Sequence, residues 1–99
     1  MYTYVDIPSL VLEWDETKRD LNLRKHNLDF RLCDLVFDGR PLYSYASPRG
    51  DEQRIVSIAM VEATMVAAIW LERDGRIRII SVRRARRGEE RAYRALHDR

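Results

Sequence analysis

The sequence has few of the residues from which several common kinds of site are built. It contains one cysteine, two histidines, four glycines and three prolines among 99 residues. The single cysteine, Cys33, excludes an internal disulfide, and His26 and His97 are too far apart in sequence to belong to a spaced set of metal ligands. No glycine-rich phosphate loop or nucleophilic-serine motif occurs. We therefore expect neither a metal site nor a cofactor.

Long hydrophobic runs are also missing. The longest apolar stretch, residues 63–71, is interrupted by Thr64 and is far shorter than the ~20 residues that a membrane-spanning helix needs. No basic segment precedes an apolar run at the N-terminus, so no secretory signal is predicted. We expect one cytoplasmic domain, residues 1–99, that has no membrane partner and in which residues 1–9 form a loose lead-in.

Charged residues are plentiful, but they are unevenly distributed. Residues 1–75 contain nine Lys and Arg against thirteen Asp and Glu, whereas residues 76–99 contain nine Arg against three Asp and Glu. Sixteen of the eighteen basic residues are arginine, whose planar guanidinium keeps its charge and fits phosphate. A charge run is most often a solvated helix face, but its concentration at one end of the chain favours an anionic partner such as nucleic acid.

The hydrophobic pattern predicts an α+β fold. Asp15 is placed to cap a helix that ends at His26, and Asn27 suits the left-handed conformation after it. A second helix from residue 29 is predicted by an apolar stripe that includes Cys33, which we interpret as a buried packing residue. Strands are predicted at residues 10–14, 41–46, 53–61, 64–71 and 76–82, with Asp74-Gly75 as a hairpin turn and a final helix at residues 86–97. The expected architecture is an antiparallel sheet of four to five strands, with two N-terminal helices and one C-terminal helix packed on it.

Two sets of side chains are candidates for chemistry. Asn22, Lys25 and His26 share one face near the end of the first helix. Histidine is suited to proton transfer near neutral pH, and a neighbouring lysine would lower the pKa of the histidine. The alternative is that these cations only suit the negative end of the helix dipole.

The second set lies in the predicted sheet. Arg54, Glu72 and Arg78 fall on successive strands, so they can converge on one surface. The alternative is cross-strand ion pairing of Glu72 with either arginine. A ribonuclease needs a base, an acid and cations around the scissile phosphate, so such residues, together with Arg83 and Arg84, can supply the chemistry without a metal.

The order of these residues resembles that of a known family. The sequence contains Glu13-Trp14-Asp15-x-x-Lys18, Asn22-x-x-Lys25-His26-x-x-x-Phe30, Glu52-x-Arg54, Glu72-Arg73 and Arg78-Ile-Ile-Ser-Val-Arg83-Arg84-Ala85, followed by Glu89 and Tyr93. Over residues 11–95 this ordered set is similar to the BrnT family of type II toxins. The resemblance implies a RelE-like ribonuclease fold and a small bacterial toxin that cleaves RNA and arrests translation and growth. It also implies a cognate BrnA-like antitoxin with a ribbon-helix-helix domain, through which alone the complex would contact operator DNA.

The resemblance also assigns roles to individual residues. The implied functional residues are Lys25, His26, Arg54, Arg83 and Arg84, with Glu72 and Arg78 as further candidates. The charge of the last strand and helix adds Arg76, Arg78, Arg86 and Arg87 as candidate RNA-binding residues. We expect Arg54, Arg83 and Arg84 to hold RNA phosphates. His26, aided by Lys25, would transfer the proton, with Glu72 as the second candidate, and the 2′-hydroxyl of the RNA would be the nucleophile.

Three positions depart from the family pattern. Asn27 stands where the family usually has glycine, and Ala59 replaces another common glycine. Arg86 stands where the family often has a small capping residue, which predicts a frayed or reoriented start of the last helix.

Two other classes of function stay open at this point. The same cationic surface would serve an inactive toxin homologue, a module that binds RNA or an antitoxin without cutting RNA. Such a module would hardly respond to substitution of His26. A structural or adaptor protein, in contrast, would show no salt-dependent affinity for RNA.

Overall fold

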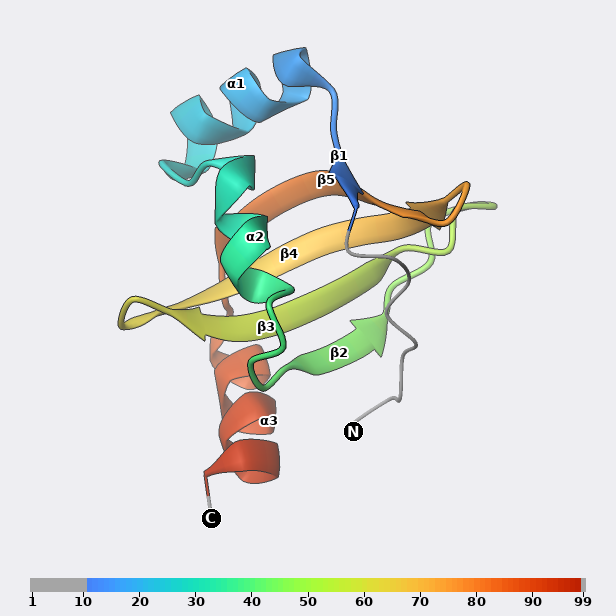
Figure 1. Cartoon of the computed structure of the whole chain (residues 1–99). Coiled ribbons are helices and arrows are strands. Elements are labelled where there is room, and N and C mark those ends of the chain that lie inside the picture. Colours follow the sequence, from blue (N-terminus) through green and yellow to red (C-terminus); the bar gives the residue numbers. More distant parts are fainter. Residues whose placement is uncertain (1–10, 99) are drawn as a thin grey trace.

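The structure, a computed structural model, describes residues 11–98 and has the predicted α+β architecture (Figure 1). Its elements, in chain order, are β1 (Leu12–Glu13), α1 (Glu16–His26), the 3₁₀ helix η1 (Phe30–Leu32), α2 (Cys33–Val36), β2 (Tyr43–Ala46), β3 (Ile55–Val61), β4 (Thr64–Arg73), β5 (Arg76–Arg84) and α3 (Arg87–His97). The expectation for the lead-in, residues 1–9, concerns a part of the chain outside the described residues. Within residues 11–98, no helix is long and apolar enough to cross a membrane.

The five strands form one sheet in the order β1-β5-β4-β3-β2. β2 to β5 make the expected antiparallel meander. Asp74 and Gly75 join the last two strands with positive φ angles of 53° and 75°, as a type I′ hairpin turn requires. The sheet differs from the prediction in one respect, because β1 runs parallel to β5. β1 is also only two residues long, since Asp15 caps α1 immediately afterwards and the chain leaves the sheet.

The N-terminal helices cover one face of the sheet. The predicted apolar stripe of Phe30, Cys33 and Phe37 is buried there. The ring of Phe37 meets Trp70 of β4 edge to face, with centroids 5.6 Å apart. Burying a side chain of this size contributes roughly 1.5–3 kcal/mol. Cys33 is therefore a packing residue, as predicted.

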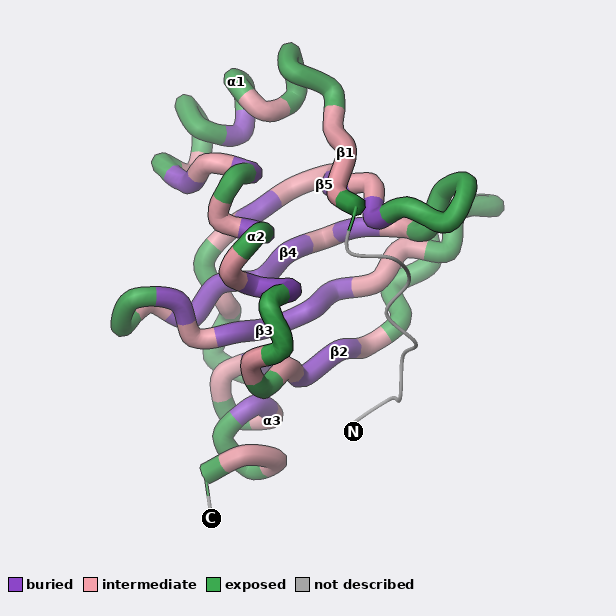
Figure 2. Tube along the Cα trace, viewed as in Figure 1, coloured by how far each residue is buried: buried purple, intermediate pink, exposed green. Residues whose placement is uncertain are grey.

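The C-terminal helix packs on the opposite face. Tyr93 is buried in a second cluster with Tyr43, Ile58 and Met65. At the end of α3, the Nε2 atom of His97 lies 2.7 Å from the carbonyl oxygen of Leu42. The main contacts of α3 are with β2 and β3, and Figure 1 shows it below these strands, away from the β4–β5 turn. Figure 2 shows the buried residues along the central strands and the exposed ones in α1 and at the turns.

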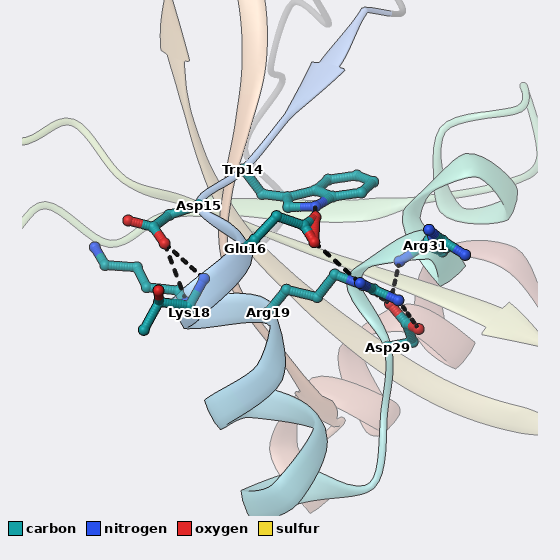
Figure 3. Close-up of polar contacts among 8 residues, drawn as sticks. Trp14, Asp15, Glu16, Lys18, Arg19, Asp29 and Arg31 are labelled. Atoms are coloured by element: carbon teal, nitrogen blue, oxygen red, sulfur yellow. Dashed lines mark hydrogen bonds and ion pairs between the residues drawn. The ribbon is translucent and has the colours of Figure 1, made fainter.

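Side-chain contacts fix both ends of α1. The Asp15 carboxylate accepts hydrogen bonds from the backbone N–H groups of Thr17 (2.8 Å) and Lys18 (3.3 Å), and Asn27 ends the helix in the left-handed conformation with φ 57°. Both predictions are confirmed. Arg19 then ties the helix to the following segment through Asp29, with an N–O distance of 2.8 Å (Figure 3).

Candidate nucleic-acid interface

The structure separates the predicted site residues into two groups along β5. The first group lies at the C-terminal end of β5 and comprises Lys25, His26, Arg83, Arg84, Arg86 and Arg87. The second group lies toward the β4–β5 turn and comprises Arg54, Glu72, Arg76 and Arg78. A strand rises about 3.3 Å per residue, so the ends of β5 are roughly 25 Å apart. The two groups therefore lie at different points along the strand.

An irregularity in β5 nevertheless places arginines of both groups on one face of the sheet. Arg78 pairs with Leu71 of β4 and Arg83 pairs with Ala67, with a register shift in between. Arg83 is five positions after Arg78 on β5, but their partners are only four positions apart on β4, because Ile80 is an extra residue. Without this bulge, strand alternation would send the two side chains to opposite faces. Both instead lie on the face that carries α3.

The side chain of Asn22 fixes α1 against β5. Its Nδ2 atom donates to the carbonyl oxygens of Val82 (2.9 Å) and Leu28 (3.0 Å). Its Oδ1 atom accepts from the backbone N–H of Val82 (3.1 Å) and from the hydroxyl of Ser81 (3.0 Å). Asn22 is buried, and these four bonds fill the capacity of its amide. The contact sets the position of the next helical turn, which carries Lys25 and His26.

His26 is half-buried between positive charges. Burial lowers the pKa of His26 most, and the charges of Lys25 and Arg83 lower it further. The effect of Arg83 shows that the end of α1 and the end of β5 are electrostatically coupled. A lower pKa favours the neutral imidazole, which can accept a proton. The expected influence of Lys25 on His26 is thus present in the structure.

Arg83 is held by a residue to which no role had been assigned. Its two terminal nitrogens lie 2.8 and 2.9 Å from the two carboxylate oxygens of Glu89, and the hydroxyl of Tyr45 donates to the same carboxylate. Burial alone raises the pKa of Glu89, but the bonds from Arg83, from the backbone of Arg86 and from Tyr45 outweigh it and hold the pKa at about 2. Arg83 is therefore rigidly oriented, and part of its charge is neutralised.

Glu89 also organises the start of α3. Its carboxylate accepts a hydrogen bond from the backbone N–H of Arg86 at 2.7 Å. The helix begins at Arg87 in spite of the missing small cap, so the expected fraying is not seen. Glu89 lies three residues after Arg86, the residue that precedes the helix. A glutamate at this spacing is the sequence signal of a capping box.

The remaining cations of the first group are unpaired. The side chains of Lys25, Arg84, Arg86 and Arg87 are exposed and form no ion pair with any residue in 11–98. Together with Arg83 they place positive charge at the ends of α1 and β5 and at the start of α3. Such a surface is suited to the phosphates of a nucleic acid.

The second group forms a polar hollow. A cavity of about 280 Å³ is lined by Lys18, Glu52, Arg54, Leu71, Arg73, Arg78 and Ile80. Arg54 is paired with Glu52 at 2.8 Å, and Arg78 with Glu13 at 3.0 Å. Arg76 lies 3.6 Å from the same Glu13 carboxylate and is more exposed. The two arginines predicted to converge, Arg54 and Arg78, do line one cavity.

Glu72 does not join these arginines. It pairs with Ile77 across β4 and β5, and so lies on the face of the sheet that the N-terminal helices cover. There it lines a separate hollow of about 400 Å³ with Asp51, Glu52 and Trp70. No ion pair of Glu72 with Arg54 or Arg78 occurs, because Glu52 and Glu13 are the partners of these arginines.

Other reactive groups lie outside both sets. Within residues 11–98, no three His, Cys, Asp or Glu side chains are grouped so that they could hold a metal ion. Cys33 is fully buried, and burial, followed by the charges of Asp34 and Asp29, raises the pKa of its thiol. The thiol is therefore not a nucleophile in the folded chain.

Comparison with protein families matches this chain to one of known activity. Residues 14–89 match the family described as the ribonuclease toxin BrnT of type II toxin-antitoxin systems. The matched range contains α1, β2 to β5 and the start of α3, and with them both groups of site residues. The comparison with curated proteins found no match. The chain belongs to the BrnT family of ribonuclease toxins of type II toxin–antitoxin systems.

Proposed function

We propose that this chain is a metal-independent endoribonuclease whose reaction centre lies at the end of β5, around His26. The observation that carries the proposal is the position of His26 between Lys25 and Arg83, where burial and both charges lower the pKa of the imidazole. A neutral histidine next to fixed cations combines a base with groups that stabilise a phosphorane.

The proposed reaction is an attack within the RNA strand. His26 takes the proton of the 2′-hydroxyl, and the 2′-oxygen forms a bond to the adjacent phosphorus. The bond from phosphorus to the 5′-oxygen breaks, that oxygen takes up a proton from water, and His26 returns its proton to the solvent. Lys25, Arg83 and Arg84 stabilise the charge on the phosphate oxygens during this step. The products are a 2′,3′-cyclic phosphate and a 5′-hydroxyl.

The position of Glu72 supports His26 as the proton-transfer group. Glu72 lies on the other face of the sheet, in a hollow that also contains Asp51 and Glu52. Glu52 is paired with Arg54, but Asp51 and Glu72 form no ion pair with any residue in 11–98, and their charges disfavour RNA there. His26 instead has exposed cations around it, which attract RNA.

Membership in a type II family implies a cognate antitoxin. We propose that this antitoxin is BrnA-like, with a ribbon-helix-helix domain that contacts operator DNA for the complex. In the same proposal the chain folds as a single domain, acts in the cytoplasm, and inhibits translation and growth by cleaving RNA.

The purified chain and RNA, with and without ribosomes, test the reaction. We expect cleavage in the presence of a chelator, products that end in a 2′,3′-cyclic phosphate, and no cleavage where the 2′-hydroxyl is replaced by hydrogen. Equal cleavage of single-stranded DNA, or loss of cleavage on chelation, contradicts the mechanism. Tight RNA binding without any cleavage would favour the non-catalytic binding module.

A further inference from the structure

The hollow near the β4–β5 turn draws cations from four separate parts of the chain. Lys18 comes from the first turn of α1, Arg54 from the segment before β3, Arg73 from the end of β4 and Arg78 from β5. Leu71 and Ile80 line the same cavity, whose volume is about 280 Å³. Neither Lys18 nor Arg73 is among the residues proposed to carry out the reaction at His26.

The charges in this hollow do not cancel. Glu52 pairs with Arg54, and Glu13 pairs with Arg78, at N–O distances of 2.8 and 3.0 Å. Lys18 and Arg73 have no acidic partner within residues 11–98. Two positive charges are thus left over in a concave site, which favours an anion as the ligand.

The geometry of the cations is fixed before any ligand binds. The carboxylates of Glu52 and Glu13 orient the guanidinium groups of their partners, which are both less than one-third exposed. Figure 3 shows the side chain of Lys18 extending from α1 on the side opposite to Arg19, which is bound to Asp29. Lys18 therefore remains available for a ligand.

Arg78, which lines the hollow, and Arg83, whose charge acts on His26, lie on one face of β5. Leu71 and Ala67, the partners of Arg78 and Arg83, are four residues apart on β4, which corresponds to about 13 Å. In B-DNA the phosphates of one strand advance about 3.4 Å per nucleotide along the helix axis, and those of a more extended single strand advance farther. A single strand lying along β5 would therefore place a phosphate in the hollow about two to four nucleotides from the phosphate at His26.

We propose that this hollow binds a phosphate of the RNA substrate about two to four nucleotides from the cleavage position, so that longer single strands bind more tightly than ones too short to reach it. This inference rests on the proposed function, because the second phosphate is counted from the reaction at His26. It assigns Lys18 and Arg73 to substrate binding, with Arg54 and Arg78 oriented beside them.

Binding of short RNA tests the inference separately from cleavage. We would measure the affinity of the full chain for 2′-O-methyl RNAs of three and eight nucleotides, which the proposed reaction cannot cut. The variants are Lys18→Gln and Arg73→Gln, with Arg24→Gln as the matched control, since Arg24 is an exposed cation of α1 that pairs with Asp20. Lys18→Gln keeps the N-terminal cap, because Asp15 binds the backbone of residue 18.

We expect each hollow variant to bind the eight-nucleotide RNA about five- to tenfold more weakly than the wild type, with a salt slope smaller by about one. The three-nucleotide RNA and the control variant should show no change. Equal weakening for both lengths, or no weakening for either, overturns the inference. Unchanged RNA affinity with weaker antitoxin binding would assign the hollow to the antitoxin instead.

Two further outcomes separate the inference from the proposed function. In one outcome, Lys18 and Arg73 contribute to the binding of the longer RNA but the wild type does not cleave RNA. This result would support the phosphate site and contradict the proposed reaction. Binding of inorganic phosphate that is lost in both hollow variants but does not weaken the binding of the eight-nucleotide RNA would indicate a site for free phosphate, which overturns the assignment to the RNA strand.

Discussion

The side-chain amide of Asn22 pairs with both backbone groups of Val82. It donates to the Val82 carbonyl at 2.9 Å and accepts from the Val82 N–H at 3.1 Å. A neighbouring strand would satisfy the backbone of β5 in the same way. β1 pairs with β5 at Ile77 and Arg78. Further along this edge of β5, the side chain of Asn22 supplies the hydrogen bonds that a neighbouring strand would supply. The same contact holds the helix that carries His26, and it thereby joins stability and function.

Replacing Asn22 by alanine should destabilise the fold by about 3 kcal/mol. The substitution removes four hydrogen bonds and leaves buried backbone groups of Val82 and Leu28 without partners. Urea unfolding measures the change. Leu21→Ala is the control, because Leu21 is exposed on the same helix, and it should change stability by less than about 0.5 kcal/mol. Equal stability of both variants would contradict the role given to Asn22.

The ion pair of Glu89 with Arg83 should make stability depend on pH. The pKa of Glu89 is about 2 in the folded chain, below its ordinary value of 4.5. Its contribution is therefore complete above about pH 4.5 and is lost as the pH falls toward 2. We expect Glu89→Gln to lose on the order of 3 kcal/mol at pH 7 and to differ little from the wild type near pH 2.

Comparing Glu89→Gln with the wild type separates the effect of Glu89 on stability from the effects of other acidic residues. The pKa of Asp29 is also about 2 in the folded chain, chiefly because of its bonds to Arg19, but its effect is common to both proteins. Glu90→Gln is the control, since Glu90 forms no ion pair with any residue in 11–98. A stability difference that does not change between pH 7 and pH 2 would show that Glu89 acts by packing alone.

Removing the charge of Lys25 should raise the pKa of His26. Lys25 and Arg83 both lower that pKa, after the larger effect of burial. We would follow the imidazole signals by NMR titration in the wild type and in Lys25→Gln. Arg24→Gln removes a charge from the same helical turn but one that already pairs with Asp20, so it should move the His26 signal less. An unchanged pKa of His26 in Lys25→Gln would show that Lys25 does not act on the proposed base.

The thiol of Cys33 should react only when the chain unfolds. It is fully buried, and burial raises its pKa. In the native state a reagent therefore cannot reach the thiol, and little of it is present as the reactive thiolate. Labelling with a thiol reagent should be fast in denaturant and very slow in buffer at pH 8. Rapid labelling of the native chain would contradict the packing of η1 and α2 on the sheet.

Local signals in the sequence predicted much of this fold. Asp15 and Asn27 bound α1 because capping depends on neighbouring backbone groups. Asp74-Gly75 forms its hairpin for a similar reason, since positive φ angles favour these residues. The ordered motifs also led to the family, because they keep their spacing over most of the chain.

The arrangement of the site depended on relationships that the sequence does not display. The extra residue Ile80 decides that Arg78 and Arg83 share a face, and a bulge arises from pairing between strands rather than from one strand's own residues. Glu72 lies on the opposite face from Arg54 and Arg78 because of the same alternation. Glu89 binds Arg83 only once α3 packs back onto the sheet.

The central claim is that His26 makes this chain toxic by cleaving RNA. Induced expression in a bacterial host, with growth and total RNA followed together, tests it for the wild type, His26→Ala and the control Arg24→Gln. The account predicts that the wild type and the control stop growth and degrade RNA, whereas His26→Ala, shown to be folded by its unchanged Tm, does neither. A folded His26→Ala variant that stops growth and degrades RNA as fast as the wild type would contradict it.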